Sequence, residues 1–452
     1  MTSRRHRLAF LIALALVVSS VVTLGRAEAA TTPTVTLTSP TAGAVLRGVI
    51  TLKADASSVS GIAWVSFWVD GNKVGADATA PYAMSYDTAQ LATGDHTFRA
   101  KAADNLGQEA WSSQVTASVP NAAASGSIYW GALIAGNVYG RTQNAPWDAT
   151  TLSLFEQHAG KGVSIIHIGQ PWVWCSTTCK SQPFPAADFD LIRSHGSIPL
   201  FSWGSWSRPW QGADQPDFQL ADITAGNYDS YIRSWAQAAK SWGHPFFLRF
   251  DWEMNLTDCA CWAWQETKNG NQIGQYVPMW RHVHDIFTSV GATNVTWVWC
   301  PHREYGTTQK PLSSLYPGDA YVDWTCTDGY NNGTNPNGSM AGWKSFDTQI
   351  GPTYDLITGT VAPSKPLMIG ETGSTEYGGS KADWITTTLN SLPSKYPKLK
   401  AFVWFNAHQG GMDWPIESST TAQQAFASAI KSSVFESNTF ASLSGGPIQP
   451  MN

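Results

Sequence analysis

Two carboxylates that end two apolar strands are the residues of this chain best suited to chemistry. Glu253 lies just after the apolar run 246–250, and Arg249, Asp251 and Glu253 occupy alternate positions. Glu371 ends a second apolar run. Alternate residues of a strand point to the same side, and a buried carboxylate has to be paired or perturbed. Two carboxyls at strand ends are the minimum requirement for general acid/base or glycosyl-transfer chemistry. The rest of the chain is therefore expected to bring Glu253 and Glu371 together.

Eight strand-like apolar runs recur along the larger part of the chain, with helix-like segments between several of them. The runs are 128–134, 163–168, 198–203, 246–250, 295–299, 322–327, 367–369 and 401–405, and the helical segments are 228–242, 277–290 and 381–392. Eight buried strands that alternate with helices predict an α/β fold, a (β/α)8 barrel over residues 127–440. Chemistry in that fold lies at the C-terminal strand ends. Glu253 ends the fourth run and Glu371 the seventh, so we expect them to face each other across the barrel mouth.

Residues 31–120 have a different pattern, which predicts a separate all-β module. Apolar and polar residues alternate over 62–69 before the turn Asp70-Gly71. Short strands with a turn about every ten residues are typical of an immunoglobulin-like β-sandwich of about seven strands. Phe67-Trp-Val-Asp-Gly71 resembles the bacterial immunoglobulin-like modules found beside secreted glycan-degrading enzymes. Residues 121–126 are small and predict a linker, and residues 441–452 are expected to form a C-terminal tail.

The composition favours a surface that handles carbohydrate. Only 13% of the 452 residues are charged, the net charge is −5 and no basic stripe occurs, which argues against a nucleic-acid partner. The chain has 23 tryptophans, and aromatic residues make up 12% of it. Indole rings bind flat sugar rings by stacking, although they also fill large cores.

The first 30 residues have the pattern of a secretory signal peptide. Basic residues precede an apolar run over 8–24, and Ala27-Glu-Ala29 forms a cleavage site of small residues. A membrane anchor is the alternative interpretation, because the apolar run is long for a signal. The mature protein is expected to begin near Ala30, to be secreted to the extracellular space and to have no stable membrane insertion.

The cysteines indicate disulfides in the predicted barrel. All six lie there: Cys175, Cys179, Cys259, Cys261, Cys300 and Cys326. An even number in an exported chain is typical of disulfides, and six cysteines allow fifteen pairings. Cys175–Cys179 within one loop and Cys300–Cys326 between neighbouring strands are the expected pairs. A zinc site is the alternative, but the spacing fits no zinc pattern, so no metal is expected.

Six motifs in the barrel region are similar to those of glycoside hydrolase family 26. They are Leu248-Arg-Phe-Asp-Trp-Glu-Met-Asn255, Trp297-Val-Trp-Cys-Pro301, Tyr316-Pro-Gly-Asp-Ala-Tyr-Val-Asp-Trp324, Asp328-Gly-Tyr330, Gly370-Glu-Thr-Gly373 and Asp413-Trp-Pro-Ile-Glu-Ser-Ser419. The resemblance covers most of residues 128–425. It implies a retaining glycosidase of the clan whose acid/base ends strand four and whose nucleophile ends strand seven. Most members of the family are endo-β-1,4-mannanases, and minorities cut mixed-linkage β-glucan or β-1,3-xylan.

The resemblance assigns Glu253 as the general acid/base and Glu371 as the nucleophile. A retaining site needs two carboxyls about 5–5.5 Å apart, one protonated and one ionised. Like-charge repulsion from an ionised Glu371 would raise the proton affinity of Glu253. By the same resemblance the Tyr330 hydroxyl hydrogen-bonds Glu371, Asp328 contacts substrate and Trp404 forms a platform under the sugar at the cleavage point. A packed Tyr330 and a core Trp404 are the alternatives.

Other polar and aromatic residues follow further strand ends. Trp203, Trp262, Trp264 and His302 are expected to contact sugar in flanking subsites. The same position at strand ends makes Trp172, Trp174 and Trp206 further candidates. Asp251 is a rival acid, but a buried partner for Arg249 or for a neighbouring backbone group suits its deeper position better.

The chain departs from the family pattern beside the acid/base. Trp252 stands where the family often has His, and Leu256 stands where it often has Gly and opens the insertion 257–261. These departures leave hydrolysis intact but weaken the mannan assignment. The expected function is a secreted, monomeric endo-β-glycanase, first a β-1,4-mannanase, whose partner is a β-linked polysaccharide and which needs no cofactor. An enzyme for mixed-linkage β-glucan or β-1,3-xylan and a non-catalytic glycan-binding protein are the alternatives.

Overall fold

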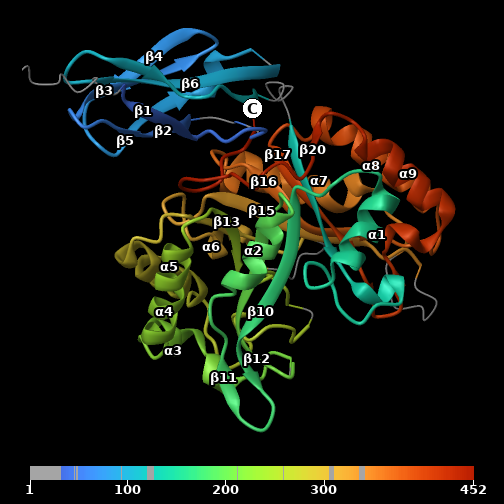
Figure 1. Ribbon diagram of the computed structural model, residues 1–452. Coiled ribbons are helices and arrows are strands. Elements are labelled where there is room, and N and C mark those ends of the chain that lie inside the picture. The colour runs from blue at the N-terminus through green and yellow to red at the C-terminus, as the bar shows by residue number, and fades with distance from the viewer. Residues whose placement is uncertain are drawn as a thin grey trace, which may run out of the picture. The chain divides into compact units, whose positions relative to one another are not determined.

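The computed structural model describes residues 32–44, 46, 49–92, 94–119, 127–210, 212–257, 259–304, 310–334 and 342–451. The predicted signal peptide and the predicted linker 121–126 lie outside these residues. The described chain divides into two compact units, an N-terminal β-sandwich and a larger α/β barrel (Figure 1). Among the described residues, no helix combines the length and the hydropathy needed to cross a membrane.

The N-terminal unit is an antiparallel sandwich, as the sequence predicts. Its strands are β1 (Thr34–Ser39), β2 (Val49–Ser57), β3 (Ile62–Val69), β4 (Asn72–Asp77), β5 (Tyr82–Asp87), β6 (Gly94–Asp104), β7 (Glu109–Trp111) and β8 (Val115–Val119). One sheet has the order β1-β2-β5 and the other β4-β3-β6-β7, with β8 also paired to β6. Alternation in β3 buries Val65, Phe67 and Val69, because successive side chains of a strand point to opposite faces.

The larger unit is a closed parallel barrel of eight strands. In chain order these are β9 (Ile128–Ile134), β10 (Ile165–Cys175), β12 (Ile198–Arg208), β13 (Phe246–Phe250), β14 (Val295–Trp299), β15 (Trp324–Asn331), β16 (Leu367–Ser374) and β17 (Leu399–Asn406). Each pairs with the next, and β9 pairs with both β10 and β17, which closes the barrel. At this closure a Cβ on Gly131 would lie 2.4 Å from the Ile165 carbonyl oxygen, so the close approach of β9 and β10 requires glycine. The predicted (β/α)8 barrel is confirmed.

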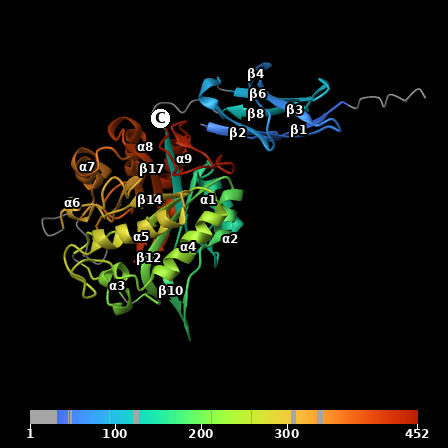
Figure 2. The same cartoon turned by 90° about the vertical axis from the view of Figure 1, so that its left-hand side faces the viewer.

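Short strands complete the sheets of this unit, and helices cover the outside of the barrel (Figure 2). The short strands are β11 (Cys179–Ser181), β18 (His408–Gln409), β19 (Met412–Asp413) and β20 (Phe435–Glu436). The helices are α1 (Ala149–Ala159), α2 (Ala186–Ser194), α3 (Leu220–Thr224), α4 (Asp229–Trp242), α5 (Tyr276–Val290), α6 (Leu312–Leu315), α7 (Phe346–Leu356), α8 (Lys381–Lys395) and α9 (Thr420–Ile430). In α4 the residues Ile232, Trp235, Ala236 and Ala239 are buried, which is the spacing of a single apolar helix face.

Four barrel strands, β10, β12, β15 and β16, run further than their apolar segments predict. β10 and β12 continue as paired strands to Trp174 and Arg208, beyond the expected ends at residues 168 and 203, and β11 pairs with the end of β10. Main-chain pairing, which does not depend on hydropathy, sustains this extension. Figure 1 shows β10, β11 and β12 projecting beyond the other strands.

The predicted C-terminal tail packs against the amino-terminal ends of the strands. Ile448 of this tail is buried in one cluster with Phe440, Tyr129 and Trp324. The Trp324 indole donates to the Ile448 carbonyl at 2.8 Å, and the Tyr129 hydroxyl donates to the carbonyl of residue 449 at 3.1 Å. These contacts close the barrel at the end opposite to the carboxyl ends of its strands.

Candidate active site

The segment that carries Glu253 contains two residues in left-handed backbone conformations, Asp251 and Glu253 itself. After β13 ends at Phe250, φ is +40° at Asp251 and +52° at Glu253, values that are uncommon for residues other than glycine. The Glu253 amide donates to the Cys300 carbonyl of the next strand at 2.7 Å. The expectation that Arg249, Asp251 and Glu253 point to one side is therefore wrong, because the extended alternation stops at the end of β13.

Asp251 turns toward β12 and away from the carboxylate pair. Its carboxylate accepts hydrogen bonds from the Ser205 amide at 2.8 Å and from the Ser205 hydroxyl at 2.7 Å. Burial raises the pKa of Asp251 to about 8, although the two bonds from Ser205 act in the opposite direction. Of its two expected partners, Arg249 and a backbone group, the structure shows the backbone group.

The surroundings of Glu253 favour its protonated form. Burial and then the negative charge of Glu371 raise the pKa of Glu253 to about 7, against the opposing effects of Arg249 and Trp262. The Trp262 indole N–H donates to Oε2 of Glu253 at 3.1 Å. A carboxyl that titrates near neutral pH can both donate and accept a proton during one reaction cycle.

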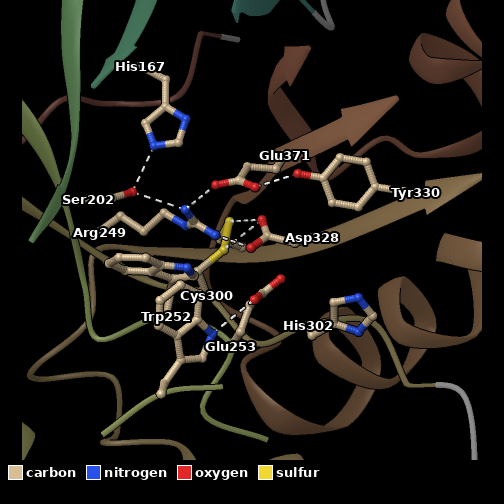
Figure 3. Close-up of polar contacts among 12 residues, drawn as sticks. His167, Ser202, Arg249, Trp252, Glu253, Cys300, His302, Asp328, Tyr330 and Glu371 are labelled. Atoms are coloured by element: carbon tan, nitrogen blue, oxygen red, sulfur yellow. Dashed lines mark hydrogen bonds and ion pairs between the residues drawn. A yellow bond between two sulfur atoms is a disulfide. The ribbon is translucent and has the colours of Figure 1, made fainter. Parts of the chain in front are cut away.

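The surroundings of Glu371 favour its ionised form. Arg249 Nη1 donates to Oε1 of Glu371 at 2.7 Å, and the Tyr330 hydroxyl donates to Oε2. Burial acts to raise the pKa of Glu371, but the charge of Arg249 and the bond from Tyr330 hold it below its ordinary value. Figure 3 shows Glu371 between these two donors. The Tyr330 bond is the one that the family resemblance implies.

Arg249 is held from two further sides. Its Nη2 forms an ion pair with Asp328, both side chains being fully buried, and its Nη1 also donates to the Ser202 hydroxyl at 3.0 Å. Ser202 Oγ lies 2.7 Å from Nε2 of His167, whose pKa burial lowers to about 4. Figure 3 shows this chain from His167 through Ser202 and Arg249 to Glu371.

Asp328, an expected sugar contact, is not exposed at the site, and two members of the network were not predicted. Asp328 is fully buried against Arg249, so it supports the guanidinium. His167 and Ser202 each interrupt an apolar run of the sequence. A polar residue inside a strand that is otherwise apolar needs a buried partner, and this signal could have identified both.

Tyr330 is itself supported by a loop that a buried lysine holds. Its ring stacks on Trp414, with 4.5 Å between ring centroids. Lys381 is fully buried, and its Nζ donates to the main-chain carbonyls of Asp413, Trp414 and Pro415 at 2.6, 3.0 and 2.6 Å. Burial lowers the pKa of Lys381 to about 7. The motif 413–419 therefore contributes the loop that packs behind Tyr330.

Three predicted sugar-binding tryptophans do not reach the site. Trp404 is 1% exposed and packs against Trp384 of α8 and Phe426 of α9, because alternation in β17 turns Ala401, Val403 and Phe405 toward the barrel interior. Trp203 is fully buried and stacks on Trp235 of α4. Trp264 is fully buried and donates its indole N–H to the Trp252 carbonyl at 2.6 Å. None of these rings can form a sugar platform in this arrangement.

Trp262 and His302 do lie at the site. Trp262 is partly exposed and hydrogen-bonds Glu253. His302 follows β14, and its amide and carbonyl both bond the Asn255 side chain at 2.8 Å. Figure 3 shows His302 on the Glu253 side of the network.

Three disulfides join the cysteines in the described residues. The predicted pairs Cys175–Cys179 and Cys300–Cys326 are confirmed, and Cys259 pairs with Cys261. Cys300–Cys326 joins the residue after β14 to the third residue of β15, with Cys300 Sγ 3.3 Å from the Asp328 carboxylate. The other two disulfides lie in the segments that follow β10 and β13.

Two family models match the sequence. The model of glycosyl hydrolase family 26 matches residues 191–348, which include Arg249, Glu253, Asp328 and Tyr330. The model of a bacterial Ig domain matches residues 33–100. Both resemblances predicted from the motifs are confirmed over these ranges, and the family 26 match supports a glycosidase. Glu371 lies beyond the matched range, so its part in the site depends on the geometry described above.

Relatives and solved structures were also found. Endoglucanase H of Acetivibrio thermocellus is 34% identical over 285 residues, which is 62% of this chain and 29% of that protein. This chain therefore spans less than a third of the relative's length. The catalytic domain of a family 26 endo-β-1,4-mannanase from Bacillus sp. JAMB-750 is 17% identical, with 70% of this chain and 88% of that chain covered and a TM-score of 0.49. A family 26 β-mannanase from Bacteroides ovatus is 17% identical, with 69% and 90% covered and a TM-score of 0.48.

Proposed function

We propose that this chain, which carries the family 26 pattern over residues 191–348, is a retaining endo-β-glycanase. The observation that carries the proposal is the opposite electrostatic setting of two carboxyls at one barrel mouth. Burial and a like charge raise the pKa of Glu253 to about 7. A guanidinium and a tyrosine hydroxyl hold the pKa of Glu371 below its ordinary value. One protonated and one ionised carboxyl are what double displacement at a glycosidic bond requires.

In the first step Glu371 attacks the anomeric carbon while Glu253 protonates the departing glycosidic oxygen. The bond between the anomeric carbon and that oxygen breaks as a glycosyl ester to Glu371 forms. The charge on Glu371 disappears in this step, which removes the repulsion that kept Glu253 protonated. Glu253 has meanwhile lost its proton to the leaving group and becomes a base.

In the second step Glu253 removes a proton from water, and the water oxygen attacks the anomeric carbon. The ester bond breaks, Glu371 regains its charge and the sugar leaves with its original configuration. Arg249 and Tyr330 donate to the two oxygens of Glu371, so they stabilise the carboxylate that each cycle consumes and regenerates. No step needs a cofactor.

A β-glucan is the substrate class we propose first. The sequence relative that is 34% identical is named an endoglucanase. The loop beside Glu253 also departs from the pattern of the mannanases at Trp252 and Leu256. β-1,4-Mannan, expected from the resemblance of the motifs alone, is the second candidate.

A glycan-binding protein without activity is the rival function. Binding alone requires exposed aromatic rings and hydrogen-bond donors. It gives no reason to surround one carboxylate with two donors and to keep a neighbouring carboxyl protonated. The network around Glu371 therefore favours the enzyme.

Export from the cell is part of the proposal. The pattern of residues 1–30 supports a signal peptide, and three disulfides are typical of oxidising compartments. An immunoglobulin-like module beside a glycosidase unit fits the same location. Sequencing the amino terminus of the protein recovered from the culture medium tests this part, with a start near Ala30 as the expected result.

The main experiment measures the release of reducing sugar from lichenan, glucomannan, mannan and β-1,3-xylan. Wild-type protein is expected to cleave lichenan or glucomannan, to give products with retained configuration by NMR, and to lose this activity in Glu371→Ala. Tight binding to any of the four without cleavage would support the glycan-binding rival. Inverted products would contradict the proposed mechanism.

A further inference from the structure

Exposed indole rings lie on the same face of the barrel as the two carboxyls. Trp174 near the end of β10 is 47% exposed, and Trp210 just after β12 is 57% exposed. Other tryptophans on these strands, Trp172 and Trp203, are fully buried. Two exposed indoles at the neighbouring extensions of β10 and β12 are therefore candidates for a binding surface, since exposed apolar patches often mark ligand-binding sites.

Both rings are held in place by polar contacts. The Arg208 guanidinium lies 4.9 Å from the centroid of the Trp174 ring, and Arg208 is the register partner of Trp174 in the paired extensions of β10 and β12. The Trp210 indole N–H donates to the Cys261 carbonyl at 3.1 Å. Presenting a ring in a fixed orientation lowers the entropy that a ligand has to overcome when it stacks on that ring.

Two disulfides brace the segments that carry these contacts. Cys175–Cys179 closes the turn between β10 and β11 directly after Trp174. Cys259–Cys261 closes the insertion beside the acid/base, and Cys261 supplies the carbonyl that accepts from Trp210. The Ala213 amide also donates to the Ala260 carbonyl at 3.0 Å, which joins the loop after β12 to this insertion.

Trp210 is linked to the catalytic pair through the segment that carries Cys261 and Trp262. Cys261, which accepts from Trp210, is followed directly by Trp262, whose N–H donates to Glu253. The Trp262 ring also lies 6.5 Å from the Trp206 ring between centroids. A chain of contacts therefore leads from Glu253 through Trp262 and the Cys261 carbonyl to Trp210.

We propose that Trp174, Arg208 and Trp210 form a distal subsite that stacks on sugar rings of the same β-linked polysaccharide whose bond is cut between Glu253 and Glu371. We call these three residues the Trp174–Trp210 surface. The proposal rests on the proposed function. Its ligand is a neutral chain of pyranose rings, whose faces stack on indoles and whose hydroxyl groups can accept from the guanidinium. The insertion at 257–261, which departs from the family pattern, thereby supports a binding surface on the Glu253 side of the site.

The test compares kcat/KM for the cleaved polysaccharide with kcat/KM for its oligosaccharides of increasing length. The variants are Trp174→Leu, Trp174→Phe, Trp210→Leu and Trp210→Phe, because Phe keeps a flat ring and Leu keeps only apolar volume. For the polysaccharide, each Leu variant is expected to lose about fivefold to tenfold in kcat/KM. The shortest cleaved oligosaccharide should react as in wild type, and the Phe variants should retain most of the activity.

Several results would overturn the proposal. Losses that are equal at every chain length would show that these residues act on the catalytic centre. Equal losses in the Leu and Phe variants would assign the effect of Trp210 to its bond with Cys261 and not to stacking. Wild-type rates at all lengths would remove the surface from substrate binding.

Failure of the proposed function is distinguishable from failure of this inference. If wild-type protein cleaves none of the four polysaccharides, the glycanase assignment fails. Affinity electrophoresis through gels with lichenan or glucomannan then decides the inference separately. If the gel retards wild-type protein but not the Leu variants, the result supports sugar binding by the Trp174–Trp210 surface. Equal mobility of wild type and all variants overturns the inference.

Discussion

The two carboxyls of the site are surrounded in different ways. Glu371 receives hydrogen bonds from Arg249 and Tyr330, and behind these lie Asp328, Ser202 and the Lys381-held loop. Glu253 has one indole donor and lies on a segment rich in tryptophan beside a disulfide-closed insertion. The surroundings therefore hold the pKa of Glu371 below its ordinary value and raise the pKa of Glu253 to about 7. In the proposed mechanism the two glutamates differ in role because their environments differ.

The largest expected effect comes from removing either carboxyl. Glu371→Ala and Glu253→Ala should each lose several orders of magnitude in kcat, because each step of the proposed cycle uses both groups. Azide, a small nucleophile, should restore turnover of an activated aryl glycoside with opposite stereochemistry in the two variants. In Glu371→Ala it enters from the vacated face and gives the α-azide, whereas in Glu253→Ala it attacks the glycosyl-enzyme and gives the β-azide. NMR of the products checks this, and reversed stereochemistry would exchange the two roles.

The next largest effect is expected from Tyr330→Phe. This change keeps the ring on Trp414 but removes the hydroxyl that donates to Glu371. A bond to a charged group contributes about 1.5–3 kcal/mol, so kcat/KM should fall by about 10- to 100-fold. The pKa of Glu371 should rise, which moves the acidic limb of the pH profile to higher pH. Tyr316→Phe, which removes a hydroxyl bonded to Asp319, is the matched control and should leave the profile unchanged.

A smaller effect is expected from Lys381→Met, with Lys381→Arg as the charge-preserving variant. Without its Nζ the carbonyls of 413–415 lose their donor, and Trp414 should become less ordered behind Tyr330. We expect kcat to fall by about threefold to tenfold with little change in KM, since one hydrogen bond contributes about 1 kcal/mol.

A double-mutant cycle with Tyr330→Phe shows whether Lys381 acts through Tyr330. The loss caused by Lys381→Met should shrink when the Tyr330 hydroxyl is already absent. Independent, multiplicative losses would show that Lys381 contributes only to the stability of the loop.

The smallest effect is expected for Trp262→Phe and should appear on the basic limb of the pH profile. The Trp262 N–H stabilises the ionised form of Glu253, so Trp262→Phe should raise the pKa of Glu253 above about 7. The first step needs protonated Glu253, and the basic limb of kcat/KM should therefore move to higher pH. A shift of the acidic limb instead would contradict the separate roles of the two sides. Trp206→Phe, which changes a neighbouring indole without a bond to Glu253, is the control.

Much of the site can be predicted from the sequence because of where the carboxyls stand. Glu253 and Glu371 follow short apolar runs, and the barrel places the ends of parallel strands at one face. Tyr330 was assigned to Glu371 by resemblance of the motif 328–330, and the structure contains that bond. Two of the three disulfides were also predicted, one because its cysteines share a loop and one because its cysteines lie on neighbouring strands.

The direction of individual side chains is what could not be predicted. A barrel strand is buried on both faces, so its sequence is apolar at successive positions and does not show which residues face the helices. Trp203 and Trp404 face them, and Trp264 is enclosed by Trp252 and Trp262. The left-handed conformations at Asp251 and Glu253 likewise separate two carboxyls that strand alternation predicts on one side.

The sequence by itself determined the class of chemistry, since residue types and the order of apolar segments specify two carboxyls on strands four and seven. Only the tertiary structure shows the contacts that separate the pKa values of the two carboxyls. These contacts join Arg249 to Asp328 and to Glu371, which lie on two other strands. Asp328 is 79 positions and Glu371 is 122 positions from Arg249 along the chain. Electrostatic interactions act through space at a few ångströms, and no local pattern of sequence records those distances.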